Sequence, residues 1–253
     1  MTLALTVLGG SPAWPNPGQA ASGYVVEGDR GRVLVDCGSG IAAELRAHDP
    51  GPLDAVVITH FHADHCFDLV PLHYAYRYGS WRERPAPVLY LPPGGRQTLD
   101  TMASIWGGSL ETFAAAFELL EFDPRGGVVV GDLHFRFAQS LHYTTCYSVE
   151  ISSPSGTIVY SGDSGPTERL VEFARDADLF LCEAALRNGS VDGEDRGHLD
   201  AREAGVIAAR AGAARLVLTH VPAENGDDEV LSQARQAYEG PVELARPGLR
   251  CEV

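Results

Sequence analysis

The chain has 253 residues, of which 45% are hydrophobic, so a sizeable core can be buried. Its formal net charge is −15, and every basic residue is an arginine because the sequence contains no lysine. Long nucleic acids draw most of their affinity from clustered basic side chains, so we expect none as a partner. No apolar run approaches the ~20 residues of a membrane span, and the N-terminal residues do not read as a signal peptide. We therefore expect a cytoplasmic protein without a membrane partner.

The five cysteines occur singly, without a Cys-x-x-Cys pair. An odd, sparse set in a chain of this length argues against a disulfide framework and fits a reducing compartment. Most of them are predicted to be small buried hydrophobic residues. They are Cys37, Cys66, Cys146, Cys182 and Cys251. Cys66 differs from the others because it directly follows a histidine-rich loop, and its role stays open.

Strand-like runs separated by turn residues extend along the whole chain. They cover 3–8, 23–27, 32–36, 55–59, 88–91, 128–130, 134–141, 147–152, 157–160, 179–181, 216–219 and 242–245. Helical periodicity is found at about 40–48, 66–78, 95–105, 109–119, 166–175, 200–212 and 227–238. No linker or repeat is evident, so residues 1–253 are predicted to form a single α/β domain. The order of elements favours two packed sheets with helices outside.

The strongest signal is a histidine-rich loop, HFHADH, at the end of the predicted strand 55–59. It places His60, His62, Asp64 and His65 within six residues. One tetrahedral ion cannot use all four side chains, because so short a loop cannot aim them at one point. Two ions fit better, with the first two histidines facing one ion and Asp64 and His65 facing the other.

Three further candidate ligands stand at the ends of later strands. His142 follows the run FRFAQSL, Asp163 lies in YSGDSG, and His220 follows LVLT. Strand ends at one rim of a sandwich are where rigid scaffolds place functional loops. Zinc is preferred for mixed imidazole and carboxylate ligands, and manganese or iron would fit the same residues. The predicted first site contains His60, His62 and His142, the second contains Asp64, His65 and His220, and Asp163 bridges them.

In order and strand context, these residues resemble those of the metallo-β-lactamase-fold hydrolases, over essentially the whole chain. The resemblance implies a four-layer αββα sandwich. The segment GHLDAREA is similar to an additional histidine motif of the tRNase Z-like phosphodiesterase branch. In that branch the histidine, here His198, protonates the leaving group instead of binding metal. It sits beside a glutamate from the preceding strand end, which corresponds to Glu183 in LFLCE.

The chain departs from true tRNase Z enzymes in one respect. Those enzymes carry a long arm that grips the tRNA, inserted between the equivalents of His142 and Asp163. Here only twenty residues separate the two positions, and they read as strand, turn and strand. Among relatives without the arm, segments such as HFHADHC and YSGDSG are similar to those of bacterial cyclic-nucleotide phosphodiesterases.

The resemblance implies a reaction in which a small phosphodiester, such as 3′,5′-cyclic AMP, is hydrolysed. Two divalent ions about 3.5–4 Å apart can hold a bridging hydroxide for in-line attack. His198, oriented by Glu183, would protonate the departing alkoxide, and Asp64 would accept a hydrogen bond from the hydroxide as general base. Asp36, in the run VLVDCG, is predicted to orient a ligand loop.

Other functions remain open at this point. The HxHxDH loop also suits an acyl hydrolase acting on a lactone, thioester, ester or lactam, although His198 and Glu183 favour a phosphodiester. An arm-less tRNase Z-like ribonuclease, a non-catalytic scaffold and a redox diiron protein are further alternatives, the last requiring a flavin domain. The aromatic segment 71–81 could stack a base, form a dimer contact, or pack as an amphipathic helix. By analogy with relatives, we expect a homodimer.

Overall fold

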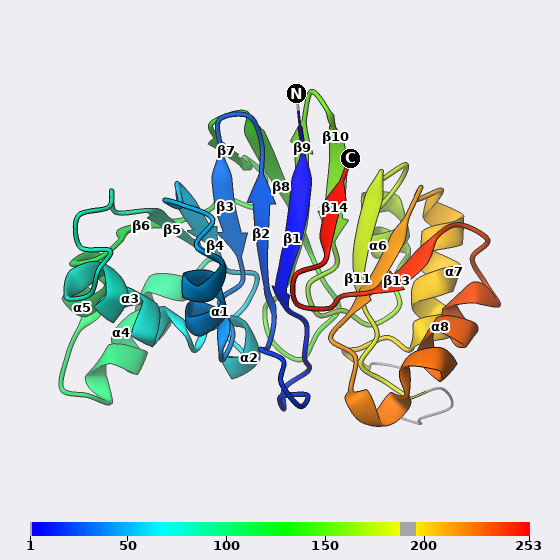
Figure 1. The fold of residues 1–253 in the computed structure, drawn as a ribbon, viewed down its shortest axis with the longest axis horizontal. Helices are drawn as coiled ribbons and strands as arrows, with labels where there is room; N and C mark the ends of the chain where they lie inside the picture. The colour runs from blue at the N-terminus through cyan, green and yellow to red at the C-terminus, as the bar shows by residue number, and fades with distance from the viewer. Residues whose placement is uncertain (1, 188–195) are drawn as a thin grey trace.

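The computed structural model describes residues 2–187 and 196–253, and it consists of two mixed seven-stranded sheets that face each other (Figure 1). The first sheet contains, in spatial order, β14 (Arg250–Glu252), β1 (Ala4–Gly9), β2 (Gly23–Glu27), β3 (Arg32–Val35), β4 (Ala55–Val57), β5 (Val88–Leu91) and β6 (Glu118–Glu121). The second sheet contains β13 (Val242–Leu244), β12 (Leu216–Thr219), β11 (Leu179–Glu183), β10 (Gly156–Tyr160), β9 (Tyr147–Ser153), β8 (Leu133–Gln139) and β7 (Val128–Val130).

Helices cover the outer face of each sheet (Figure 1). The first sheet is covered by α1 (Ile41–His48), α2 (Ala63–Cys66), α3 (Leu69–Arg77), α4 (Gly95–Ser104) and α5 (Leu110–Ala114). The second sheet is covered by α6 (Glu168–Phe173), α7 (Ala201–Ala211) and α8 (Asp227–Arg235), and a 3-10 turn, η1, spans Ala223–Asn225. No helix among the described residues is both long and apolar enough to cross a membrane.

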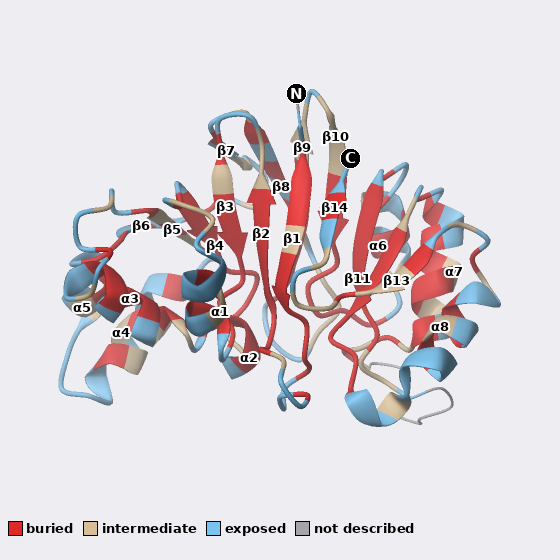
Figure 2. Ribbon diagram, in the orientation of Figure 1, coloured by how far each residue is buried: buried red, intermediate tan, exposed pale blue. Residues whose placement is uncertain are grey.

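Three apolar clusters hold the layers together, and Figure 2 shows that buried residues make up most of the central strands. Because side chains alternate between the two faces of a strand, Leu34 packs against helices while Val35 packs between the sheets. In the second sheet, Phe180 faces helices and Leu181 faces the first sheet. Burial on both faces explains why these strands read as continuous apolar runs. The result is the four-layer αββα sandwich that the sequence predicts.

The core between the sheets should respond strongly to lost volume. Ile151 of β9 is 1% exposed and lies opposite Ile158 and Phe135 on the neighbouring strands. We expect Ile151→Ala to lower the free energy of unfolding by about 2–5 kcal/mol and Ile151→Val by about 0.5–1.5 kcal/mol. Urea denaturation followed by circular dichroism measures both changes. Equal effects of the two substitutions would contradict a close-packed environment at this position.

Two predicted helices and two strands differ from the structure. The helix predicted at 109–119 is wrong beyond α5, because residues 118–121 form β6, which pairs in parallel with β5 at the sheet edge. The helix predicted at 66–78 is interrupted between α2 and α3, where the Asp68 carboxylate accepts a hydrogen bond from the Ala42 amide. The short strand β14, which pairs with β1, is absent from the sequence prediction. In each case the structure depends on a contact with a residue distant in the chain, and local periodicity does not encode such contacts.

All candidate functional residues lie at one rim of the sandwich. Strands β8 and β10 both run antiparallel to β9, and β10, β11 and β12 are parallel, so their C-terminal ends point the same way. In the first sheet, β3 and β4 are also parallel to each other. The loops that follow these strands therefore bring residues from both sheets to a common edge, the lower edge in Figure 1.

Candidate metal centre and active site

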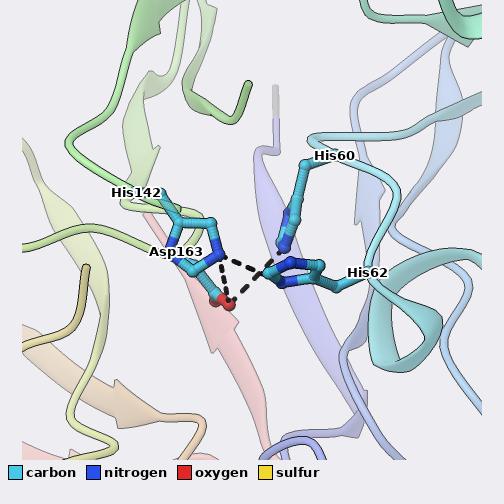
Figure 3. A group of neighbouring side chains, drawn as sticks. All are labelled: His60, His62, His142 and Asp163. Carbon is cyan, nitrogen blue, oxygen red and sulfur yellow. Dashed lines mark hydrogen bonds and ion pairs between the residues drawn. The ribbon is translucent and has the colours of Figure 1, made fainter. Parts of the chain in front are cut away.

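The first group of candidate ligands combines two loops of the second sheet with the histidine-rich loop of the first (Figure 3). One ligand atom from each of His60, His62, His142 and Asp163 lies within 4.8 Å of the others. Asp163 Oδ2 is 3.5 Å from His60 Nε2 and 3.7 Å from His142 Nε2. The Nε2 atom of His142 is 3.1 Å from His62 Nδ1. Nitrogen and oxygen atoms that converge in this way are suited to hold a cation between them.

The second group shares one residue with the first. It consists of Asp64, His65, Asp163 and His220, which also converge within 4.8 Å and are all buried. His220 Nε2 lies 2.9 Å from Asp64 Oδ2, and His65 Nε2 lies 3.3 Å from Asp163 Oδ1. Asp163 is therefore positioned between the two groups. The structure thus brings together all seven residues that the sequence singles out as ligands, in the predicted grouping.

Buried polar atoms without partners indicate what the two groups bind. Among the described residues, His60 Nε2, His65 Nε2 and Asp163 Oδ1 are buried and have no hydrogen-bond partner. A buried polar atom without a partner carries a large desolvation cost, so such atoms are rare in native proteins. All three atoms point into the shared cluster, where a metal ion would satisfy them. The donor set of imidazoles and carboxylates fits divalent metals.

The electrostatics of the cluster favour cation binding. Burial, together with the charge of His65, holds the pKa of His60 well below its usual value, which keeps its Nε2 lone pair free. Burial alone would raise the pKa of Asp163, but the charges of His220 and His65 hold it well below the usual range. Burial alone would lower the pKa of His65, but the nearby carboxylates of Asp163 and Asp36 raise it well above its usual value. The site therefore attracts positive charge to the point where His65 and Asp163 meet.

Asp36 fixes the orientation of the histidine-rich loop. It is fully buried at the end of β3 and has a φ of 58°, a left-handed conformation that Asp tolerates better than most residues. Its carboxylate accepts hydrogen bonds from the Thr59 amide at 2.8 Å and the Tyr160 hydroxyl at 3.2 Å. The same carboxylate lies 2.7 Å from His65 Nδ1, which directs His65 Nε2 toward the candidate metal position. This arrangement agrees with the orienting role predicted for Asp36.

A separate histidine–carboxylate pair lies beside the cluster. His198 Nδ1 is 2.8 Å from the Oε1 atom of Glu183, which is fully buried at the end of β11. The same carboxylate accepts hydrogen bonds from the amides of Ser164 at 3.0 Å and Ala185 at 3.1 Å. Burial lowers the pKa of His198, but the hydrogen bond and charge of Glu183 outweigh it and raise the pKa to about 9. The raised pKa favours the protonated form of His198, whose ring centroid lies 5.5 Å from that of His220.

The start of α7 holds the segment that carries His198. The Asp200 carboxylate accepts a hydrogen bond from the Glu203 amide at 2.8 Å, and the Glu203 carboxylate accepts one from the Asp200 amide at 3.0 Å. This reciprocal capping box satisfies two amides that the first helical turn would otherwise leave unpaired. We expect Asp200→Ala to reduce the free energy of unfolding by about 0.5–2 kcal/mol, whereas Asp200→Asn, a good capping residue, should cost less. Thermal denaturation of both variants measures the difference.

Two residues that sequence reasoning missed anchor the loop that carries His220. The side chain of Asn16 donates a hydrogen bond to the Val221 carbonyl and accepts one from the Ala223 amide, both at 2.8 Å. The Tyr24 hydroxyl lies 2.6 Å from Thr219 Oγ1. These contacts join the first sheet and its loop to the end of β12, about 200 residues away in sequence. Only the position of Asn16 within the proline-rich run WPNPG hints at a turn with a structural role.

The aromatic segment 71–81 divides between core and surface. Leu72, Ala75 and Tyr76 of α3 are buried, as expected for an amphipathic helix, and Trp81 packs against Tyr76. Tyr74 and Tyr78 are 50% and 70% exposed, respectively. All five cysteines are free and buried, in agreement with the prediction made for most of them. Neither the exposed tyrosines nor Cys66 belongs to the clusters of candidate ligands.

A buried cluster of histidines and aspartates, placed at the strand ends of two facing sheets, defines a metallo-hydrolase. The comparison with known families agrees with this class, because the sequence model described as a beta-lactamase superfamily domain matches residues 31–221. The chain belongs to the beta-lactamase superfamily, within which it fits the tRNase Z-like branch that lacks the tRNA-binding arm.

Similar proteins occur in several bacteria. YhfI of Bacillus subtilis, named a probable metallo-hydrolase, is 32% identical, with 97% of this chain and 98% of that protein covered. The crystal structure of YhfI superposes with a TM-score of 0.89 over 100% of both chains, at 30% identity. Ribonuclease Z of Myxococcus xanthus is 30% identical, with 99% of this chain and 98% of that protein covered. Protein ML1173 of Mycobacterium leprae is 36% identical over 98% of this chain and 88% of its own length.

The segment between His142 and Asp163 is short in the structure, as the sequence indicates. Strands β9 and β10 occupy most of it and form an antiparallel hairpin in which Ser153 lies opposite Gly156. A tight hairpin leaves no room there for an inserted arm. Access to the candidate metal centre is therefore not shaped by a projecting domain at this position.

Proposed function

We propose that this metallo-hydrolase is a dinuclear phosphodiesterase that hydrolyses a small phosphodiester, with a 3′,5′-cyclic nucleotide such as cyclic AMP as the preferred substrate. The observation that carries the proposal is the 2.8 Å contact between His198 and the buried Glu183 beside the ligand clusters. An alkoxide leaving group needs a proton, and a histidine whose pKa is raised to about 9 can supply one at neutral pH.

Each group of the site has a separate task in this proposal. When bound, two divalent ions, with zinc as the first candidate, would supply an activated water and neutralise charge on the phosphoryl oxygens. Asp163 belongs to both ligand groups and would join them. Asp64 Oδ2, which faces both His220 and His65, would accept a hydrogen bond from the attacking water. His198 would donate its proton to the departing oxygen, and Glu183 would keep the ring oriented.

Two observations favour a small substrate over a long RNA. The hairpin of β9 and β10 replaces the arm that grips tRNA, and the net charge of −15 disfavours a phosphate-rich polymer. A ribonuclease function is the second candidate, because Ribonuclease Z of M. xanthus matches almost the whole chain. The two functions differ in substrate size and not in the chemistry of the leaving group.

The proposal is tested by turnover of 3′,5′-cyclic AMP with protein reconstituted with zinc, manganese or iron, and metal content determined on the same samples. We expect hydrolysis to a nucleoside monophosphate by the loaded wild type. Precursor tRNA and a panel of lactones and thioesters serve as competing substrates. A fully metallated protein that cleaves one of these and leaves phosphodiesters of nucleotide size intact would contradict the proposal.

A further inference from the structure

Tyr143 is an exposed aromatic residue at the edge of the candidate active site. It directly follows the ligand His142, and its side chain is 62% exposed. The centroid of its ring lies 5.2 Å from the ring of His142 and 5.7 Å from the ring of His198. An exposed aromatic ring carries a hydration cost that burial of Tyr143 in a core would remove. Its position beside the candidate acid leaves the ring available to a molecule bound at the site.

The ring of Tyr143 lies against the segment that carries His198. A Cβ atom at Gly197 would lie only 2.9 Å from Tyr143 Cε2 and 3.0 Å from His142 Nδ1. The Gly197 carbonyl also accepts the hydrogen bond of His142 Nδ1, at 2.8 Å. The edge of the tyrosine ring thus rests against the backbone of Gly197, one residue before His198. The Tyr143 hydroxyl makes no hydrogen bond within the described parts of the chain, so both the ring and the hydroxyl are open to a ligand, and Tyr143→Phe separates their contributions.

The chemistry of the reaction indicates which part of a substrate meets this ring. The proton from His198 goes to the leaving oxygen, so the group attached to that oxygen must lie next to His198 and hence near Tyr143. Arg196, two residues before His198, is engaged by the Glu203 carboxylate. The ring of Tyr143 therefore offers the leaving group a planar apolar surface. Planar rings stack on such a surface whatever their charge.

We propose that Tyr143 is a stacking platform that selects phosphodiesters whose leaving group carries a planar ring, such as a nucleoside. This inference rests on the proposed phosphodiesterase function and narrows its substrate class. Tyr143 acts through contact with the ring of the substrate and takes no part in proton transfer. Its contribution should appear in substrate affinity, because a base stacked in the bound substrate remains stacked in the transition state.

The test compares 3′,5′-cyclic AMP with the matching cyclic ribose phosphate that lacks the base, using the metal-loaded wild type, Tyr143→Ala and Tyr143→Phe. We expect Tyr143→Ala to reduce the preference for the base-containing substrate, as the ratio of kcat/KM values, by about 5- to 150-fold. The change should reside in KM, and Tyr143→Phe should restore the preference. Tyr78→Ala, which removes a 70% exposed tyrosine directly after α3, is the matched control and should leave the ratio unchanged.

Equal losses on both substrates would overturn the proposal, because they would show that Tyr143 only supports His142 or His198. A direct binding measurement separates this inference from the proposed function. Calorimetric titration of the metal-loaded proteins with adenosine 5′-monophosphate should give weaker binding to Tyr143→Ala than to the wild type. If the wild type hydrolyses neither substrate but this difference is found, the proposed reaction fails and the stacking platform stands. Identical binding by the two proteins would contradict the platform whatever the turnover.

Discussion

His198→Ala is expected to lower the kcat for phosphodiester hydrolysis by about 10²–10⁴-fold, the contribution typical of a general acid. The substitution leaves all seven candidate ligands in place, so the metal content should remain that of the wild type. Measurement of kcat and of bound metal on the same preparations tests both statements. A parallel loss of metal would assign His198 to the metal centre and contradict its role as an acid.

The pH profile and the leaving group provide internal controls for this prediction. His198 is active as an acid only while protonated, and its pKa is raised to about 9, so wild-type kcat should decline as the pH rises through that value. The alkaline decline should be absent from His198→Ala. An activated ester such as bis(p-nitrophenyl) phosphate needs little protonation of its leaving group, so its hydrolysis should depend much less on His198. Equal sensitivity of both substrates would argue against proton donation.

Asp163→Ala is expected to abolish stable metal binding and, with it, hydrolysis. Asp163 is 1% exposed and faces His60 and His142 on one side and His65 on the other, so its removal affects both ligand groups. The loss of affinity should exceed the roughly 10–100-fold that removal of a residue behind the ligands typically costs. Titration of the metal-free protein with zinc in the presence of a competing chelator measures the change.

Asp36→Asn is the matched comparison for Asp163→Ala. Asn tolerates the positive φ of this position, and it retains a hydrogen-bonding group of similar size beside His65. Because only the charge behind His65 is removed, the affinity for metal should fall by about 10–100-fold and activity should be recoverable at high metal concentration. Activity that excess metal restores in Asp163→Ala as fully as in Asp36→Asn would contradict the shared position assigned to Asp163.

The groups of candidate ligands could be predicted from the sequence because their chemistry is local. The spacing of His60, His62, Asp64 and His65 requires two directions of coordination whatever the surrounding fold. The strand-end positions of His142, Asp163 and His220 follow from apolar runs that are buried on both faces. The pairing of His198 with Glu183 came from resemblance to a family, and the 2.8 Å contact supplies the geometry.

Features that depend on distant partners could not be read in the same way. Strand β6 has the sequence ELLE, which suits a helix as well as a strand, and only its pairing with β5 decides between them. Asn16 is an ordinary turn residue until the loop after His220 folds against it. The density of aromatic residues in the sequence points to the tyrosines near residue 76 and not to Tyr143, because it does not tell which rings lie near the candidate ligands.

The candidate ligands come from both sheets, which has a consequence for how the protein matures. His60, His62, Asp64 and His65 belong to the first sheet, whereas the remaining three ligands belong to the second and extend to residue 220. An ion that binds the assembled chain but not the unfolded one adds about 2.7 kcal/mol of stability when its concentration is 100 times the dissociation constant. A bound ion would therefore connect the two sheets, because side chains from both sheets hold it. A nascent chain cannot complete the site until most of its length has been synthesised. A fully bound metal centre would therefore require that both sheets have folded and packed together.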